Sequence, residues 1–271
     1  MAVQSGSVIR AQPVATPASP AADSGFAAQV DAGLAYFQRR ANDQVPLVVA
    51  LRDAIAGGDL DDAKPAYVAS RPPYEEIEVL AASFPDTDEA IDARPYAFDE
   101  GETSADFRGF HRIEALLYRD GDLTAALPVA GELIASIETL RRDLTIRENF
   151  SAAGQFDGVI ALSNEVAAKK MSSEEETWSD QSMLIFRHNW IGVWSQYEPF
   201  APEVAAIDPT VAVAVERAYA EAMTLADAAF TPGSVAAIPY SQVPVETRGR
   251  IVAASYALRD SLIAARQALG V

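Results

Sequence analysis

The chain has 271 residues, of which 49% are apolar and 22% charged, ordinary values for a globular protein with a packed core. Its net charge of −18 excludes general binding to nucleic acid, which needs a basic face, and disfavours docking on an anionic membrane. The lack of cysteine excludes disulfides, thiol nucleophiles and cysteine-ligated metal centres.

Residues 1–22 read as a flexible leader, because they are rich in Ala, Ser, Pro and Val and contain no apolar segment of the signal-peptide type. We expect such a start for the mature form of an exported protein. The longest obvious apolar run is the seven-residue stretch 45–51, so no membrane span is predicted.

Beyond residue 23 the apolar residues recur with helical spacing. Phe26, Val30, Leu34 and Phe37 begin the first predicted helix, which Gly57 and Gly58 end. Further helices are predicted from residue 59 and over 72–81, 107–118, 122–140, 156–170, 177–199, 203–230 and 244–269, with an acidic loop over 84–104. Strand-like alternation is nearly absent, so the pattern predicts an all-α fold of two helical bundles, at 23–148 and 149–271, after the leader.

Acidic residues concentrate between residues 75 and 106, where only Arg94 is basic. Glu75 and Glu78 are three residues apart on one predicted helix, and His111 and Glu114 repeat that spacing on another. Two such pairs on neighbouring helices are an arrangement that bundles use to hold a cation. Imidazole with carboxylates suits zinc, manganese, iron or copper, and oxygens alone suit calcium or magnesium. By itself, however, an H-x-x-E pair is more often a surface salt bridge.

Other kinds of site find less support. The sequence contains no G-x-S-x-G, H-E-x-x-H, Walker A or G-x-G-x-x-G motif, and His111 and His188 are its two histidines. A glycosidase carboxylate pair stays open, since 39 acids supply many pairs. Four arginines flank the acidic segments: Arg71, Arg94, Arg108 and Arg112. They either pair with these acids or bind a carboxylated ligand.

Three segments together carry a family resemblance. They are S-R-P-P-Y-E-E-I-E at 70–78, F-P-D-T-D-E-A-I-D-A-R at 84–94 and R-G-F-H-R-I-E at 108–114. In this order they resemble the imelysin family, in its EfeO-type branch of M75 peptidase-motif proteins. Pro85 departs from the glycine expected there. The resemblance covers about residues 25–269 and implies two antiparallel bundles with a cleft between them.

The resemblance also implies a divalent-metal site. The ligands carried over are Glu75, Glu78, Asp92 and His111, with Glu114 completing the motif. The implied metal is calcium, zinc, iron or copper, and the implied location is the periplasm or cell surface of a Gram-negative bacterium. Members act in iron uptake, and one stand-alone member binds alginate. Because we find no cupredoxin-like segment in this sequence, we expect the stand-alone type to be the closer match.

Three functions follow, in order of preference. The first is a binding protein that holds a metal and a polyuronate such as alginate, with Arg71, Arg94, Arg108 and Arg112 as ligand-binding residues. A charge of −18 opposes a polyanion, so local arginines or a bridging cation would have to overcome it. The second is a metal-binding component of an iron uptake system with its uptake partner. The third is a zinc metallopeptidase, ranked last because no separate general base is evident. We therefore expect no enzymatic activity.

Overall fold

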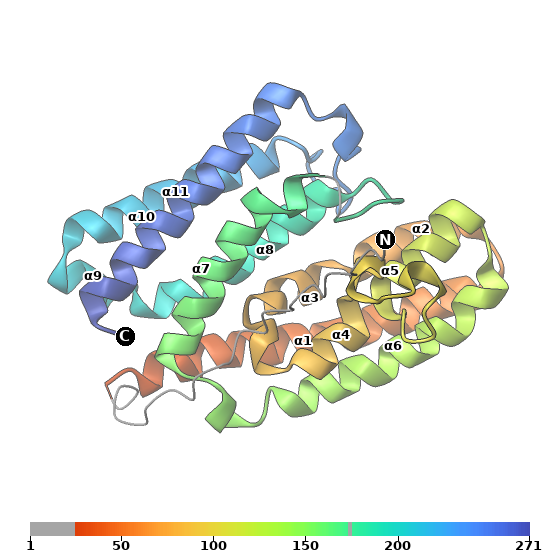
Figure 1. Ribbon diagram of the computed structural model, residues 1–271, viewed down its shortest axis with the longest axis horizontal. Coiled ribbons are helices and arrows are strands. Elements are labelled where there is room, and N and C mark those ends of the chain that lie inside the picture. Colours follow the sequence, from red (N-terminus) through yellow and green to blue (C-terminus); the bar gives the residue numbers. More distant parts are fainter. Residues whose placement is uncertain (1–24, 173–174) are drawn as a thin grey trace, which may run out of the picture.

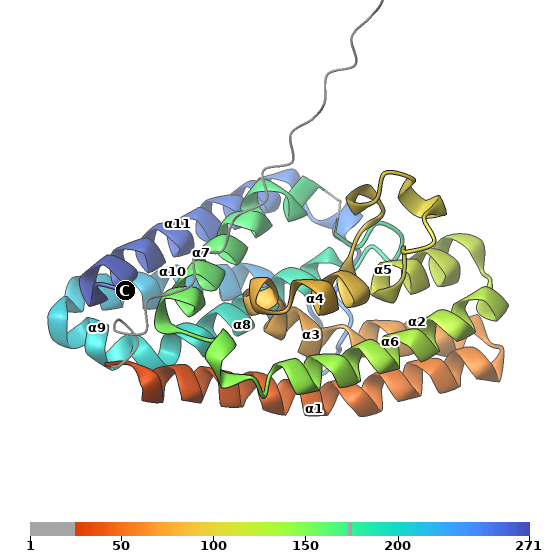
Figure 2. The ribbon, with the colours of Figure 1, turned by 60° about the horizontal axis from the view of Figure 1, so that its bottom comes forward.

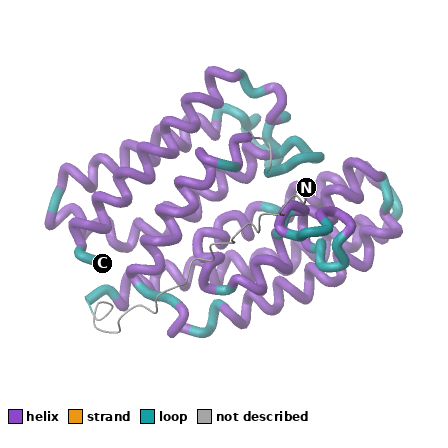
Figure 3. Tube along the Cα trace, in the orientation of Figure 1, coloured by secondary structure: helices purple, strands orange, loops and turns teal. Residues whose placement is uncertain are grey.

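The computed structural model describes residues 25–172 and 175–271, so the predicted leader at 1–22 lies outside the described residues. In the described part of the chain the regular structure is helical, and its one pairing of extended backbone is an isolated antiparallel bridge between Phe230 and Ala237. Figure 3 shows helices joined by loops. The prediction of an all-α fold is confirmed.

The helices form two groups that lie beside each other (Figure 1). The first group contains α1 (Ala27–Gly57), α2 (Leu60–Ser70), α3 (Pro72–Ile77), η1 (Glu78–Ser83), α4 (Pro85–Asp92), α5 (Gly109–Glu114) and α6 (Leu123–Asp143). The second contains α7 (Ala152–Ala168), η6 (Lys170–Ser172), α8 (Ser182–Tyr197), α9 (Ala201–Ile207), α10 (Pro209–Asp227) and α11 (Val245–Leu269). The π-helical turn η4 (Ala115–Asp120) follows α5. The other short helical turns are η2 (Pro95–Ala97), η3 (Gly101–Thr103), η5 (Arg147–Asn149), η7 (Glu198–Phe200) and η8 (Tyr240–Gln242).

Long helices within each group pack side by side, as the second view shows for α1 and α6 (Figure 2). The predicted apolar stripe of α1 is buried, with Val30 and Phe37 at 0% exposure. In the second group α7 and α10 both pack on α11. These contacts remove the apolar helix faces from water, which is the main driving force for this fold.

The two groups meet where α3 packs on α8 and η1 packs on α7. A Cβ atom at Gly192 of α8 would lie 2.2 Å from the carbonyl oxygen of Glu76. Glycine at this position therefore lets the backbones of α3 and α8 approach more closely than a residue with a side chain would allow. This close approach brings the acidic residues of α3 against the second group. The predicted boundary between residues 148 and 149 and the predicted cleft stay predictions.

The expected loop over 84–104 is wrong at its start, because residues Pro85–Asp92 form α4. Pro85 occupies the first helical turn, and Asp86 and Asp88 there favour the positive end of the helix dipole. Thr87 and Ile91 are buried, and α4 packs against α6. The contact with α6 thus stabilises this helix. Its apolar face is short and lies among acidic residues, so the sequence pattern did not predict it.

Two further helices differ from the predicted ranges. The segment expected at 203–230 divides into α9 and α10, because the side chain of Asp208 accepts hydrogen bonds from the backbone N–H groups of Thr210 and Val211 and Pro209 follows it. The segment expected at 177–199 begins as a helix only at Ser182. Residues 175–181 form turns that carry functional side chains, described below.

One described helix, α6, is long and apolar enough to cross a membrane by length and composition. It packs against α1 and α5 here. A single helix of this kind is weak evidence for a span, because core helices pass the same test.

Candidate metal centre

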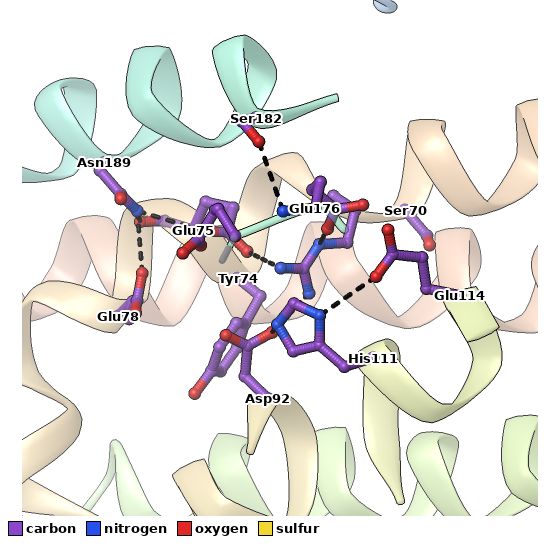
Figure 4. A network of polar contacts seen from close by, with 12 residues as sticks. Ser70, Tyr74, Glu75, Glu78, Asp92, His111, Glu114, Glu176, Ser182 and Asn189 are labelled. Atoms are coloured by element: carbon purple, nitrogen blue, oxygen red, sulfur yellow. Dashed lines mark hydrogen bonds and ion pairs between the residues drawn. The ribbon is translucent and has the colours of Figure 1, made fainter. Parts of the chain in front are cut away.

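A buried network of charged side chains lies where the two helix groups meet (Figure 4). Its residues come from α3, η1, α4, α5, η6, α8, the segment before α8, and from Arg71 just before α3 and Arg94 just after α4. We call it the ion network; in the described part of the chain it comprises Arg71, Glu75, Glu78, Asp92, Arg94, His111, Glu114, Lys170, Glu175, Glu176 and Asn189. Such a concentration of buried charge costs desolvation free energy and requires close pairing.

Arg71 is the hub of the network and is 0% exposed. Its guanidinium contacts Glu75 Oε1 at 2.6 Å, Asp92 Oδ1 at 2.6 Å and Glu176 Oε1 at 2.9 Å. The same group lies 4.5 Å from the ring centroid of Phe110. One arginine therefore links α3, α4, α5 and the turn before α8, which its planar set of five donors allows.

The G-F-H-R-I-E motif forms α5, and its glycine is required by the backbone. Gly109 has φ +75°, and a Cβ there would lie 2.2 Å from the carbonyl oxygen of Ile91. This contact sets the start of α5 against the end of α4 and so brings His111 beside Asp92. His111 Nε2 lies 3.6 Å from Asp92 Oδ1, and its Nδ1 lies 3.3 Å from Glu114 Oε2.

Burial alone would lower the pKa of His111, but its two carboxylate neighbours, Asp92 and Glu114, raise it to about 9. Without a metal, the ring is therefore an imidazolium between two acids at neutral pH. Asp92 has the complementary shift: burial opposes ionisation, but Arg71 and His111 hold the pKa of Asp92 well below its usual range.

Glu114 is held by backbone groups of the other helix group. Its Oε1 accepts hydrogen bonds from the N–H groups of Trp178 at 2.8 Å and Ser179 at 2.7 Å. Burial would raise the pKa of Glu114, but these bonds and the contact with His111 lower it. The π-helical turn η4 follows Glu114 directly, and such turns are frequent at functional sites.

Glu176 completes a cluster that has the composition of a metal site. Burial raises the pKa of Glu176 to about 8 although Arg71 is adjacent, and Tyr67 donates a hydrogen bond to it at 3.0 Å. One ligand atom each from His111, Glu114 and Glu176 lies within 4.8 Å of the others. We call these three residues the His111 cluster.

The opposite end of the network is built around Lys170, which is 2% exposed. Its ammonium lies 2.7 and 2.8 Å from the two carboxylate oxygens of Glu78, and 3.1 Å from both Glu175 Oε1 and Asn189 Oδ1. We call these oxygens of Glu78, Glu175 and Asn189 the Lys170 cage. Glu175 also pairs with Arg94, which closes this end of the network.

In the described network, carboxylate side chains outnumber the side chains that carry a permanent positive charge. Six carboxylates face three such cations, Arg71, Arg94 and Lys170, with His111 in addition. Burial raises the pKa values of Glu75, Glu78 and Glu176, so protons offset part of the excess. A metal cation can replace those protons.

Two buried atoms of this network support a fit to a metal ion. In the described part of the chain, His111 Nε2 and Asp92 Oδ2 have no hydrogen-bond partner. An unpaired buried polar atom costs free energy, and a cation bound to Asp92 Oδ2 and to deprotonated His111 Nε2 would remove that cost. The donor set of imidazole and carboxylate oxygen suits the divalent first-row metals.

The residues predicted from sequence lie in three places: near Arg71, in the Lys170 cage, and outside the ion network. Glu75, Asp92, His111 and Glu114 lie together near Arg71. Glu78 lies beside Asn189 (Figure 4) and pairs with Lys170. Arg71 and Arg94 pair with acids inside the network.

The other two predicted arginines lie outside the network. Arg108 is exposed, and Arg112 lies over the ring of Phe107, 5.7 Å from its centroid. Of the two interpretations offered for the four arginines, pairing with acids therefore describes Arg71 and Arg94.

The sequence analysis missed Lys170, Glu175, Glu176 and Asn189. A run of three glutamates at 174–176, close to two of the three lysines of the chain, was the available signal. It lacks helical spacing because Glu175 and Glu176 lie in turns, and charged runs are common on surfaces. Asn189 was hidden in an aromatic stretch that reads as core.

Comparison with known proteins identifies a matching family and related sequences. The family model described as Imelysin matches residues 31–264. The iron uptake system component EfeM of Pseudomonas syringae pv. syringae (strain B728a) is 32% identical over 171 residues, which are 62% of this chain and 59% of that protein. The iron uptake system component EfeO of Escherichia coli (strain K12) is 27% identical over 218 residues, 80% of this chain and 58% of that protein.

A solved structure shows the same fold. The iron-regulated protein A precursor of Parabacteroides distasonis ATCC 8503 matches with a TM-score of 0.70 and 17% identity, over 91% of this chain and 97% of that one. The chain spans less than three fifths of the length of each of these two curated relatives. Those relatives are named as iron uptake components, which agrees with the expectation of a binding protein rather than an enzyme.

Proposed function

The chain belongs to the imelysin family, and from that premise we propose that it is a metal-binding component of an iron uptake system, holding one metal ion at the His111 cluster. The names of the EfeO and EfeM relatives support iron as the cargo. The observation that carries the proposal is the convergence of His111, Glu114 and Glu176 within 4.8 Å inside a network that has excess acid.

The ligand chemistry favours a divalent first-row ion. Imidazole nitrogen with two carboxylate oxygens suits ferrous iron, manganese and zinc better than calcium, which prefers oxygen alone. Asp92, whose Oδ2 is free of hydrogen bonds in the described residues, would complete the ligand set. Binding must displace the proton held by His111 and the one held by Glu176, so affinity should rise with pH.

Protein ligands that are already buried favour storage and transfer of an ion over catalysis on a polymer. His111, Glu114 and Glu176 are at most 3% exposed, so a peptide could not reach a metal there without separation of the helix groups. A peptidase needs an open coordination position and a substrate groove. We therefore propose a carrier that passes iron to an uptake partner, with the periplasm as its predicted location.

Alginate binding is the weaker proposal and stays a prediction. Arg71 and Arg94 are committed to buried acids, which leaves Arg108 and Arg112 from the predicted set to contact a polyuronate. The relatives described above are named for iron uptake, not for polysaccharide binding.

Calorimetric titration of metal-free protein with Mn²⁺, Zn²⁺, Ca²⁺ and, under anaerobic conditions, Fe²⁺ tests the metal proposal. We expect one tight equivalent of Fe²⁺ or Mn²⁺ and a weaker response to Ca²⁺. His111→Gln and Glu114→Gln should each weaken binding by about 100-fold or more, since a lost ligand should cost at least as much as a lost outer-shell partner.

His188→Gln is the matched control, because His188 is also paired with a glutamate but lies outside the ion network. Its metal affinity should equal that of the wild type. Unchanged metal affinity in folded His111→Gln would overturn the proposed ligand set. Addition of alginate to the metal-free and metal-loaded proteins, with a neutral polysaccharide as control, tests the weaker proposal.

A further inference from the structure

The segment that carries Glu176 closes one side of the His111 cluster. We call residues 175–181 the Glu176 segment. Its backbone N–H groups at Trp178 and Ser179 donate to Glu114 Oε1 at 2.8 and 2.7 Å. The side chains of the cluster are at most 3% exposed, so an ion held there leaves through a local opening of the protein. Separation of the Glu176 segment from α5 divides the ligands and so releases the ion.

The far end of the Glu176 segment is joined to the connection between α10 and α11. The backbone N–H of Tyr240 donates to the carbonyl oxygen of Asp180 at 2.8 Å. The carboxylate of Asp180 accepts from the N–H of Ser241 at 2.9 Å and from its hydroxyl at 2.5 Å. The side-chain amide of Gln181 exchanges two hydrogen bonds with the backbone of Ala237, at 2.9 and 3.3 Å, as a second peptide group would. These bonds fix the Glu176 segment to a part of the chain about 60 residues away.

Tyr240 is the centre of this attachment, because it contacts the chain both before and within the Glu176 segment. Besides its backbone bond to Asp180, its phenol donates to the carbonyl oxygen of Met171 at 2.7 Å. The side chain is 2% exposed, and its ring lies edge-on to Phe186 of α8 with the centroids 5.8 Å apart. The Arg248 guanidinium of α11 lies 4.3 Å from the centroid of the Tyr240 ring. Two long helices therefore hold Tyr240 in place.

The backbone of Asp180 shows that the Glu176 segment depends on this attachment. Asp180 has φ +62°, the one positive value among the described residues other than glycine. A residue with a side chain keeps such a conformation where its surroundings hold it there. The bonds from Tyr240 and Ser241 are those surroundings. If they are weakened, the Glu176 segment loses the contacts that set its shape.

We propose that Tyr240, with Asp180 and Gln181, is a positioning residue that sets how fast the ion leaves the His111 cluster. The three residues act through the backbone of the Glu176 segment, which they hold against α5. When this attachment is weakened, the segment separates from α5 more often and the ion dissociates faster. The inference rests on the proposed function, but it concerns release of the ion and not the identity of its ligands.

The test is the rate at which Mn²⁺ leaves the loaded protein after mixing with a fluorescent chelator in a stopped-flow instrument. Tyr240→Phe removes one hydroxyl and should raise the dissociation rate about 10-fold, since outer-shell partners contribute about 10–100-fold to metal affinity. Gln181→Leu, which removes the partner of the Ala237 N–H, should have an effect of similar size. Ser255→Ala is the matched control: it removes a buried hydroxyl that donates to the carbonyl oxygen of Ser163 at 2.6 Å, between α11 and α7, and it should release Mn²⁺ at the wild-type rate.

A conservative pair of variants at Asp180 separates positioning from general damage. Asp180→Ala removes the acceptor for Ser241 and places alanine at a positive φ, so it should speed release. Asp180→Asn keeps an acceptor oxygen and tolerates a positive φ, so its release rate should lie close to that of the wild type.

Hydrogen exchange of the metal-free proteins, followed by mass spectrometry, gives a second readout. Tyr240→Phe should speed exchange in peptides that contain Trp178 and Ser179 and leave peptides of α6 unchanged. Ser255→Ala should leave the Trp178 and Ser179 peptides as in the wild type. Faster exchange throughout Tyr240→Phe, or unchanged exchange in the Glu176 segment, would overturn the positioning role.

Two kinetic results would overturn this inference alone: wild-type release of Mn²⁺ from folded Tyr240→Phe, or equally fast release from Ser255→Ala. In both cases the wild type still binds Mn²⁺, so the proposed function stands. A wild type that binds no metal ion would instead refute the proposed function, and the inference about release would fall with it.

Discussion

Two histidine–glutamate pairs lie at the junction of the helix groups, and their surroundings are opposite. His188 of α8 lies 2.7 Å from Glu76 of α3, and Tyr36 and Arg40 of α1 also donate to that carboxylate, at 2.5 and 2.6 Å. One acid thus has three donors. We call these four residues the Glu76 junction. His111 and Glu114, by contrast, lie in a network with surplus acids and unpaired atoms.

The pKa shifts express the same difference. Burial would raise the pKa of Glu76, but the hydrogen bonds from His188 and Tyr36 and the charge of Arg40 lower it. In the ion network the outcome is mixed: the pKa of Glu114 is lowered like that of Glu76, but burial prevails at Glu75 and Glu176 and raises their pKa values. Proximity of histidine to glutamate is therefore a poor sign of a metal site. A surplus of buried acceptors over donors is the better one.

The largest expected effect is a loss of stability when Arg71 of the ion network is replaced. Arg40 of the Glu76 junction provides the comparison. Arg71→Met should lower the free energy of unfolding by about 3–5 kcal/mol, because it leaves several buried carboxylates without their partner. Arg40→Met should cost about 1 kcal/mol, since Arg40 is 24% exposed and Glu76 keeps two donors. Urea denaturation in the presence of a chelator measures both, and equal losses would contradict the comparison.

Neutralising the acid of the Glu76 junction should affect stability but not metal binding. Glu76→Gln removes the charged acceptor shared by three donors and should cost about 1.5–3 kcal/mol. Its Mn²⁺ affinity should remain that of the wild type, in contrast to Glu114→Gln. A large loss of metal affinity in folded Glu76→Gln would show that the two regions are coupled.

A smaller, graded effect should appear with pH. The folded-state pKa values of His111, about 9, and Glu176, about 8, lie above the ordinary values of 6.5 and 4.5. The folded protein thus binds more protons than the unfolded one between these limits, and stability falls as pH rises. We expect the melting temperature of the metal-free protein to fall from pH 6.5 to 9.

Metal binding should reverse this trend, because the ion takes the place of the protons. Melting curves with a chelator and with excess Mn²⁺, at the same pH values, make the comparison. His111→Gln should flatten the decline of the metal-free protein between pH 6.5 and 9. A melting temperature that rises across this interval would contradict the assigned protonation.

The smallest effect is expected at an arginine that belongs to neither region. Arg108→Ala should change stability by less than about 0.5 kcal/mol, because the side chain is exposed. Its Mn²⁺ affinity should match that of the wild type. Loss of metal binding in this variant would extend the site to the surface before α5 and would revive the predicted ligand-binding role of Arg108.

Much of this protein could be predicted from its sequence because helical periodicity is a local property. The apolar spacing of Val30, Leu34 and Phe37 predicted α1, and the G-F-H-R-I-E segment identified α5 and its His111–Glu114 pair. The glycine of that segment is required because Gly109 has a positive φ beside Ile91. The family resemblance was inferred from such segments, because each can be recognised in the sequence without knowledge of distant contacts.

Only the tertiary structure decided which charges share one site. Glu75 and Glu78 do lie on one side, because the amide nitrogen of Asn189 donates to both carboxylates at 3.1 and 2.9 Å, but their charged partners differ: Glu75 pairs with Arg71 and Glu78 with Lys170. Lys170 ends one predicted helix and Glu176 precedes the next, about 60 residues beyond His111. The energy of a buried charge depends on partners brought from distant segments, so no local pattern in the chain could reveal it.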